Sequence, residues 1–415
     1  HLRAPSHFLA AHRVYLLPYS PGSFYPFLAE MWSAVAMAFG GDAAAKLVNF
    51  GVLVLTASSL AAFGAELGEA AAGRLAALLY VAIPAAGVLA GQTYNDLETA
   101  WLVLLAVRLS RSRTAGDRMA AGALCGAAMG CKLLGAWALP ACAVLWIKAP
   151  PLAGARGQRR ALGALTWPLA AVAAVFIVWP LKNWLWTGNP LYPMFPGLFP
   201  HGGWNPYLTA EQAGRFVPGA APAGAGALAL ALVRFPWAAS LNVTAIGVRL
   251  TPLLAGLLPA LLLPAASRPG IVGTALAGAW YAALWVAASA GEGRYLMEAA
   301  ALLVLPAANA ARALGAGSRP AGAVVAAAIA ATVALQAGHW TEHVSRLYVP
   351  WRVVLGLEPR ELYLNRGLLP NGEFVPMARR INAELPRTAR LLYASDIVSY
   401  YIERDVAFDV QQVMP

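Results

Sequence analysis

Apolar runs near 20 residues in length recur along almost all of this 415-residue chain. An α-helix needs about 20 predominantly apolar residues to cross the hydrocarbon core of a bilayer. The chain is 60% hydrophobic and only 12% charged, which leaves too little charge to cover the surface of a soluble protein of this length. The sequence therefore predicts an all-α polytopic membrane protein.

About ten segments have the length and composition of a membrane span. They lie near 44–65, 73–91, 96–110, 118–132, 133–147, 161–181, 249–266, 271–289, 295–311 and 320–338. Together they predict a transmembrane bundle over residues 44–338, which includes a long outer loop at 182–248.

Basic residues give the orientation of this bundle. The formal net charge of +11 would suggest a nucleic-acid partner in a soluble protein. Here Lys and Arg gather in short segments between apolar runs, as they do in cytoplasmic loops. One such loop holds Arg108, Arg111, Arg113 and Arg118. The other holds Lys148, Arg156, Arg159 and Arg160. We therefore expect no nucleic-acid partner, and both loops on the cytoplasmic side.

Counting outward from these loops places five segments outside: 1–43, 92–95, 182–248, 290–294 and the tail from 339. The count requires residues 118–147 to form a hairpin of two short spans that breaks near Lys132 and Gly135. One long helix would put the two basic loops on opposite faces of the membrane. The hairpin brings Lys132 near the outer side or into the bundle.

Both flanks of the bundle differ from it in composition. Residues 1–43 are expected to form a first outer loop, whose amphipathic stretch 24–39 fits a helix lying along the interface. Residues 339–415 predict strands at 389–395 and 406–410 with a short helix between them, the start of a small extracytoplasmic α/β segment. The abrupt start at His1 predicts a fragment that lacks its first span, and the end at a strand-like run predicts a truncated C-terminal segment.

One further segment has two interpretations. Residues 224–240 fit a second interfacial helix or an additional span. The additional span would invert every later segment and make the tail cytoplasmic.

A polar segment, Thr93-Tyr94-Asn95-Asp96-Leu97-Glu98-Thr99, interrupts the apolar sequence at the expected outer surface. Ionisable groups are costly in a membrane and are usually functional there. Asn95 and Glu98 fit a helix N-cap with a capping box. Residues two apart on a helix point about 200° from each other, so Asp96 and Glu98 cannot face one cavity. Asp96 has no structural task and is the candidate functional carboxylate.

Three basic residues lie near the same expected surface: Lys132, Lys182 and Arg294. Each one alone fits an ordinary interface anchor with a snorkelling side chain. Alternatively, the three converge on one anionic group, because Arg binds phosphate bidentately and Lys acts as a point charge.

The cysteines and histidines do not predict a metal site. Cys125, Cys131 and Cys142 lie in apolar segments without metal-ligand spacing and are expected in the core. The spacing of the first three histidines does not fit a helical metal pair. Glu30 fits either a second acidic site group or a solvated face residue.

At these residues the chain resembles bacterial GT-C glycosyltransferases of the dolichyl-phosphate-mannose protein mannosyltransferase and aminoarabinose transferase kind. The resemblance covers most of residues 1–310. Five stretches carry it in order: Tyr25-Pro26 with Glu30; Tyr94-Asn95-Asp96; Gly130-Cys131-Lys132; Trp179-Pro180-Leu181-Lys182-Asn183 with Gly188-Asn189-Pro190-Leu191-Tyr192-Pro193; and Gly293-Arg294-Tyr295.

The resemblance implies an inverting transfer of a sugar from a polyprenyl-phosphate donor to an acceptor on the outer face. A carboxylate acts as general base, and Asp96 is the catalytic candidate in this chain. His1 is similar to a His that follows the family's principal Asp, which implies that this Asp lies upstream. The implied substrate-binding residues are His1, Tyr25, Glu30, Tyr94, Asn95, Lys132, Lys182, Asn183, Arg294 and Tyr295.

One stretch departs from the family pattern. Phe24-Tyr25-Pro26 stands where the aminoarabinose-transferase branch has Glu-Lys-Pro, so the phosphate-contacting Lys of that branch is absent. The resemblance also implies a multi-pass protein of the bacterial inner membrane, with its site facing the periplasm. The expected partners are the lipid-linked donor, a lipid, glycan or protein acceptor, and the bilayer. No cofactor is certain, and a divalent cation is the one candidate.

Three other functions remain open at this stage. A transporter or lipid flippase would be expected to have inverted repeats and carboxylates at mid-span, and neither is evident. A non-catalytic membrane scaffold and a lipid-linked glycan enzyme of another fold are the other two.

Overall fold

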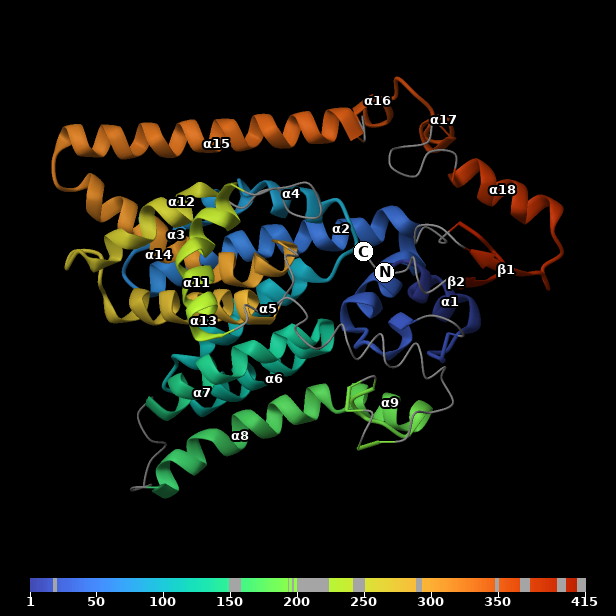
Figure 1. Cartoon of the computed structure of the whole chain (residues 1–415), viewed down its shortest axis with the longest axis horizontal. Coiled ribbons are helices and arrows are strands. Elements are labelled where there is room, and N and C mark those ends of the chain that lie inside the picture. Colours follow the sequence, from blue (N-terminus) through green and yellow to red (C-terminus); the bar gives the residue numbers. More distant parts are fainter. Residues whose placement is uncertain are drawn as a thin grey trace.

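The computed structural model describes residues 1–17, 21–148, 158–192, 194–195, 198–199, 224–241, 251–288, 293–347, 351–365, 374–393 and 401–408. These residues are mostly helical (Figure 1). The elements of the first half are α1 (Arg3–Ala11), η1 (Pro21–Phe24), α2 (Leu28–Glu66), α3 (Ala70–Val81), α4 (Pro84–Ala90), α5 (Asp96–Ser110), α6 (Ala115–Cys131), η2 (Leu133–Trp137), α7 (Ala138–Lys148), α8 (Gln158–Phe176) and α9 (Val178–Thr187).

The second half continues the bundle and then leaves it. Its elements are α11 (Ala225–Leu241), α12 (Pro252–Leu257), η3 (Leu258–Leu262), α13 (Pro269–Ala288), η4 (Gly293–Leu296), α14 (Met297–Gly315), α15 (Arg319–Leu347), α16 (Trp351–Val354), α17 (Arg360–Asn365), α18 (Phe374–Glu384), β1 (Arg390–Tyr393) and β2 (Asp405–Phe408).

The longest helix, α2, joins the expected interfacial stretch to the first expected span. It runs for 39 residues and is kinked at Gly40 and Gly41. Gly41 has a φ of +64°, a conformation that glycine adopts without the steric penalty of a side chain. The kink separates the N-terminal part of α2, which carries Glu30, from the part that packs into the bundle.

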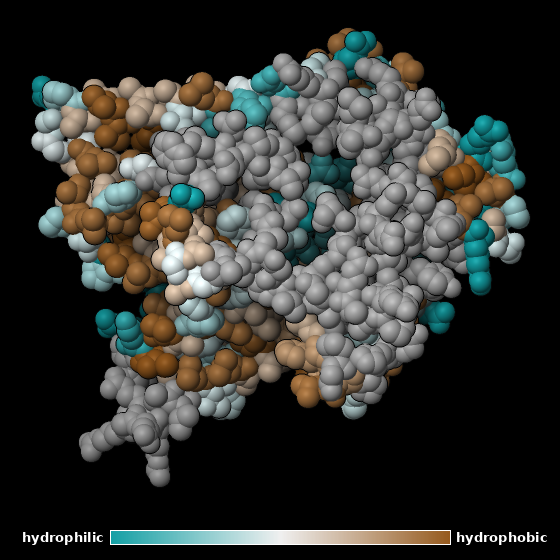
Figure 2. Space-filling model, viewed as in Figure 1, coloured by the Kyte–Doolittle hydropathy of each residue, from teal (hydrophilic) through white to brown (hydrophobic). Residues whose placement is uncertain are grey.

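Four described helices are long and apolar enough to cross a membrane, namely α2, α13, α14 and α15. Two bent pairs, α3 with α4 and α8 with α9, raise the number to six if each pair is one span. The apolar helices bear out the membrane-protein prediction, whereas the number of ten spans stays a prediction. The hydrophobic surface of the bundle is visible in Figure 2.

Two of the expected spans are interrupted in the structure. The segment 73–91 bends by 66° between α3 and α4. Ile83 is extended there, because the residue before a proline disfavours helical geometry. In the described part of 249–266, only the six-residue α12 and the 3₁₀ turn η3 form. Three prolines in that stretch interrupt its helical hydrogen bonds.

The helix break expected near Lys132 is present. α6 ends at Cys131, Lys132 is extended with φ −157° and ψ 133°, and η2 then leads into α7. A Cβ atom on Gly135 would lie 2.4 Å from the carbonyl carbon of Ala128, so the turn packs directly on α6. This geometry directs the Lys132 side chain away from its own helix.

α14 forms the centre of the hydrophobic core. Every residue from Met297 to Ala311 is buried, and the helix packs against α3, α5 and α13. The three cysteines are also buried, as predicted for small core residues. By contrast, α15 lies along the outside of the bundle (Figure 1).

The C-terminal elements contact the bundle at α2. Arg360 Nη2 lies 2.7 Å from Asp42 Oδ1, and the Tyr401 hydroxyl lies 3.1 Å from Asp42 Oδ2. β1 and β2 pair in parallel, with Arg390 opposite Asp405 and Tyr393 opposite Phe408. Most of the helix expected between these strands lies outside the described residues.

The crossing of α2 and α3 is a close helix contact between two glycines, and it generates a stability prediction. A Cβ on Gly64 would lie 2.4 Å from Gly73 Cα, whereas one on Gly51 of the same helix would meet no atom within 4 Å. Gly64→Ala should therefore destabilise the protein by about 1–3 kcal/mol through overpacking. Gly51→Ala should leave the thermal unfolding temperature in detergent unchanged or slightly raised. Equal unfolding temperatures for the two variants would contradict this packing.

Candidate functional site

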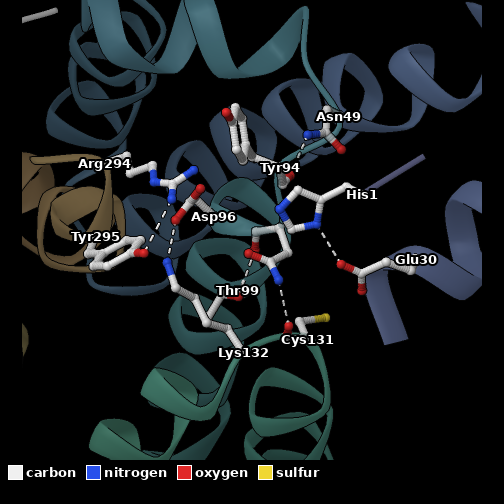
Figure 3. A network of polar contacts seen from close by, with 11 residues as sticks. His1, Glu30, Asn49, Tyr94, Asp96, Thr99, Cys131, Lys132, Arg294 and Tyr295 are labelled. Atoms are coloured by element: carbon white, nitrogen blue, oxygen red, sulfur yellow. Dashed lines mark hydrogen bonds and ion pairs between the residues drawn. The ribbon is translucent and has the colours of Figure 1, made fainter. Parts of the chain in front are cut away.

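An ion pair between Asp96 and Lys132 forms the centre of the site (Figure 3). Asp96 is the first residue of α5, where the helix dipole favours a carboxylate. Lys132 is the extended residue after α6, and its Nζ donates to Asp96 Oδ1. The side chains are only 1% and 14% exposed, so water screens this pair weakly. Asp96, which lacked a structural task in the sequence, therefore has a cationic partner.

A second cation and two tyrosines surround the pair. Lys132 Nζ lies 3.5 Å from the centroid of the Tyr295 ring. The Arg294 guanidinium carbon lies 4.5 Å from the Tyr94 ring and 5.0 Å from the Tyr295 ring, and Arg294 donates to the Tyr295 hydroxyl at 3.2 Å. Cation–π contacts of this kind hold both cations in place without neutralising them. The cluster therefore combines two cations with the Asp96 carboxylate.

Asn95 has a different role from the predicted one. It stands at the N-cap position of α5 but makes no side-chain cap hydrogen bond there. Its amide instead donates to the Cys131 carbonyl at 2.8 Å. That carbonyl ends α6 and needs a partner outside its own helix. Asn95 therefore ties the start of α5 to the end of α6, and the predicted capping box is wrong.

Tyr94 is held from both sides. Asn49 of α2 donates to the Tyr94 carbonyl at 2.6 Å. The His1 ring lies edge-on to the Tyr94 ring, with centroids 5.2 Å apart. His1 Nδ1 also lies 2.6 Å from Glu30 Oε1, and Glu30 is 6% exposed. The N-terminal segment thus meets the polar segment 93–99 through His1 and Glu30 (Figure 3).

Asp96 and Glu98 face different neighbours, as their helical spacing predicted. Both residues are 1% exposed. Asp96 pairs with Lys132, whereas Glu98 lies near Glu30 and Cys131. Glu98 Oε2 has no hydrogen-bond partner in the described part of the chain.

Sequence reasoning missed one acidic residue at the site. Glu298, in the first turn of α14, is fully buried and lies within electrostatic reach of Lys132 and Asp96. Neither of its carboxyl oxygens has a hydrogen-bond partner among the described residues. An acidic side chain inside an apolar span, four residues after Arg294, was the sequence signal that could have identified it.

Lys182 and Asn183 lie on α9 and bind backbone rather than other charged site residues. Lys182 Nζ donates to the Ser23 and Tyr25 carbonyls at 2.5 and 3.0 Å. Asn183 donates to the Phe24 carbonyl at 2.9 Å. The structure therefore brings Lys132 and Arg294 together on Tyr295, while Lys182 contacts the loop before α2. Tyr25 contributes its carbonyl to this contact, and its side chain is 39% exposed.

No group of three or more His, Cys, Asp and Glu side chains has a metal-binding arrangement among the described residues. No residue is therefore assigned to a divalent cation.

Solved structures share this fold, although sequence comparison identifies no relative. No protein-family model matches the chain, and no curated protein matches it. ArnT from Cupriavidus metallidurans bound to undecaprenyl phosphate matches with a TM-score of 0.58 and 16% identity. The same protein in the apo state matches with a TM-score of 0.59 and 17% identity. Each match covers 98% of this chain and 80% of the other. The predicted GT-C resemblance is thus confirmed at the level of the fold.

Breaking the central ion pair should cost stability in a non-additive way. Asp96→Asn and Lys132→Met should each destabilise the protein by about 3–5 kcal/mol, because each leaves a buried charge without its partner. The double variant should recover much of this loss in thermal unfolding experiments. Arg380→Met, which removes the exposed i,i+4 pair with Glu384, should change little. A double variant as unstable as the sum of the singles would contradict a direct pairing.

Proposed function

We propose that this protein is an integral-membrane glycosyltransferase that takes a sugar from a polyprenyl-phosphate donor. The observation that carries the proposal is a buried carboxylate, Asp96, held among Lys132, Arg294 and two tyrosines, in a fold shared with ArnT. One of the matching ArnT structures is bound to undecaprenyl phosphate. The cation cluster has the chemistry that a lipid phosphate requires.

The reaction would be a single inverting displacement at the anomeric carbon of the sugar. The acceptor hydroxyl forms the new glycosidic bond as the bond to the lipid phosphate breaks. Lys132 and Arg294 stabilise the negative charge that develops on the leaving phosphate. Lys132 can donate to the phosphate and to Asp96 together, since an ammonium has three N–H donors and Asp96 Oδ1 takes one of them.

The carboxylate side of the reaction belongs to Asp96, with Glu30 and His1 beside it. Asp96 orients the acceptor hydroxyl or accepts its proton, a step worth about 10²–10⁴-fold in rate. We assign the site to the periplasmic side of a bacterial inner membrane, because basic residues lie at the opposite ends of its two helices, Arg108 and Arg111 at the end of α5 and Arg118 near the start of α6.

A transporter or lipid flippase is the alternative function for the same fold. A flippase would move the lipid phosphate across vesicle membranes and leave the sugar attached. A transferase would release free polyprenyl phosphate only when an acceptor is present. Measuring both products with the full-length protein in vesicles separates the two functions.

The role of Asp96 generates a prediction about rate. In membranes that contain the full-length protein, Asp96→Asn should lower the release of lipid phosphate from a polyprenyl-phosphate sugar by about 10²-fold or more. Binding of undecaprenyl phosphate should persist, because its cationic ligands remain. Asp117→Asn, at the far end of α6 from Lys132, is the matched control and should retain activity. A full rate in Asp96→Asn would refute the assigned role.

The role of Arg294 generates a prediction about affinity. Arg294→Gln should weaken binding of undecaprenyl phosphate about tenfold or more, because a charge-assisted contact to phosphate is lost. Arg319→Gln, which changes an exposed arginine at the start of α15, should leave the affinity unchanged. Native mass spectrometry or a lipid-displacement titration measures both. Equal losses in the two variants would mean that binding depends on overall charge and not on this site.

A further inference from the structure

Two adjacent side chains of α9 bind three successive backbone carbonyls of the first outer loop. Lys182 Nζ donates to the carbonyls of Ser23 and Tyr25, and Asn183 Nδ2 donates to that of Phe24. The two partners of each contact are 157 or 159 positions apart in sequence. These contacts join the end of the bent α8–α9 pair to the segment that leads into α2.

The chemistry of the contact suits a loop clamp. The Ser23, Phe24 and Tyr25 carbonyls stand at the C-terminal end of η1, where carbonyl groups lack intrahelical partners and partial negative charge gathers. The Lys182 ammonium and the Asn183 amide supply hydrogen-bond donors to these three carbonyls. Three aromatic rings surround the ammonium, with their centroids at 4.5 Å for Phe27, 4.7 Å for Trp186 and 5.9 Å for Trp179.

The loop is fixed on its other side too. Ser23 Oγ accepts from the Leu17 amide at 3.2 Å and donates to the Leu17 carbonyl at 3.1 Å. The Phe24 ring packs on that of Tyr192, with centroids 4.4 Å apart, and both side chains are buried. The segment 21–27 is therefore held in a single position against α9.

The fixed loop determines where Glu30 lies. α2 begins at Leu28, directly after the loop, and Glu30 is its third residue. Glu30 contacts His1, whose ring packs on Tyr94, two residues before Asp96. A displacement of the loop would therefore move Glu30 and, through it, the side chain of His1.

We propose that Lys182 and Asn183 are positioning residues that clamp segment 21–27 and so hold Glu30 and His1 against the Asp96 site. The effect of this clamp on sugar transfer rests on the proposed function, whereas its effect on the loop does not. In this role Lys182 acts on the reaction through Glu30 and is not a ligand of the donor phosphate.

The effect on the loop is tested by hydrogen exchange of the full-length protein in detergent. In Lys182→Met and Asn183→Leu, the amides of residues 22–25 should exchange about tenfold faster, the change expected when a charge-assisted or buried hydrogen bond is lost. Amides of α5 should be unaffected. Lys46→Met, an exposed lysine of α2, is the matched control and should change nothing. Unchanged loop exchange in both α9 variants would overturn the clamp, whatever the activity of the protein.

The effect on transfer is tested by a double-mutant cycle with Glu30→Gln. If Lys182 acts through Glu30, the double variant Lys182→Met/Glu30→Gln should be no slower than Glu30→Gln alone, with an unchanged KM for the donor. Multiplied losses with a raised donor KM would mean that Lys182 binds the donor directly, and would overturn the positioning role. A full rate in Glu30→Gln would overturn it as well.

Discussion

The ion pair between Asp96 and Lys132 connects the break after α6 to the start of α5, and the rest of the site is arranged around it. Burial makes the contact strong and also makes each partner costly to leave alone. The neighbouring contacts reinforce the same geometry, since Asn95 donates to the Cys131 carbonyl beside Lys132. An anionic lipid headgroup that enters the site can accept from the N–H groups of Lys132 that do not bind Asp96.

The site is assembled from the ends of elements that are far apart in sequence. α5 and α14 begin at the site, and α6 ends there. Lys182 of α9 binds the loop that leads into α2 and to Glu30. Helix ends leave backbone groups and dipole charge available, which is why polar side chains collect there in an otherwise apolar bundle. The core around α14 fixes the relative positions of these ends. The packed core therefore fixes the helix ends, and the side chains at those ends contribute the chemistry.

Much of this arrangement could be predicted from the sequence, because apolar length and basic loops are strong signals in membrane proteins. The break at Lys132 followed from the need to keep two basic loops on one side, and the structure confirms it. Other features depend on tertiary contacts that no local pattern encodes. Asn95 resembled an N-cap, but the unpaired Cys131 carbonyl, 36 residues away, takes its amide. Glu298 was overlooked because its neighbours Lys132 and Asp96 come from other helices.

The central claim is that the cluster of Asp96, Lys132 and Arg294 binds a lipid-linked phosphate. The most direct test is a cryo-electron microscopy structure of the full-length protein in nanodiscs with undecaprenyl phosphate. We expect phosphate density within hydrogen-bond distance of Lys132 Nζ and the Arg294 guanidinium. Phosphate density remote from both cations would contradict this assignment.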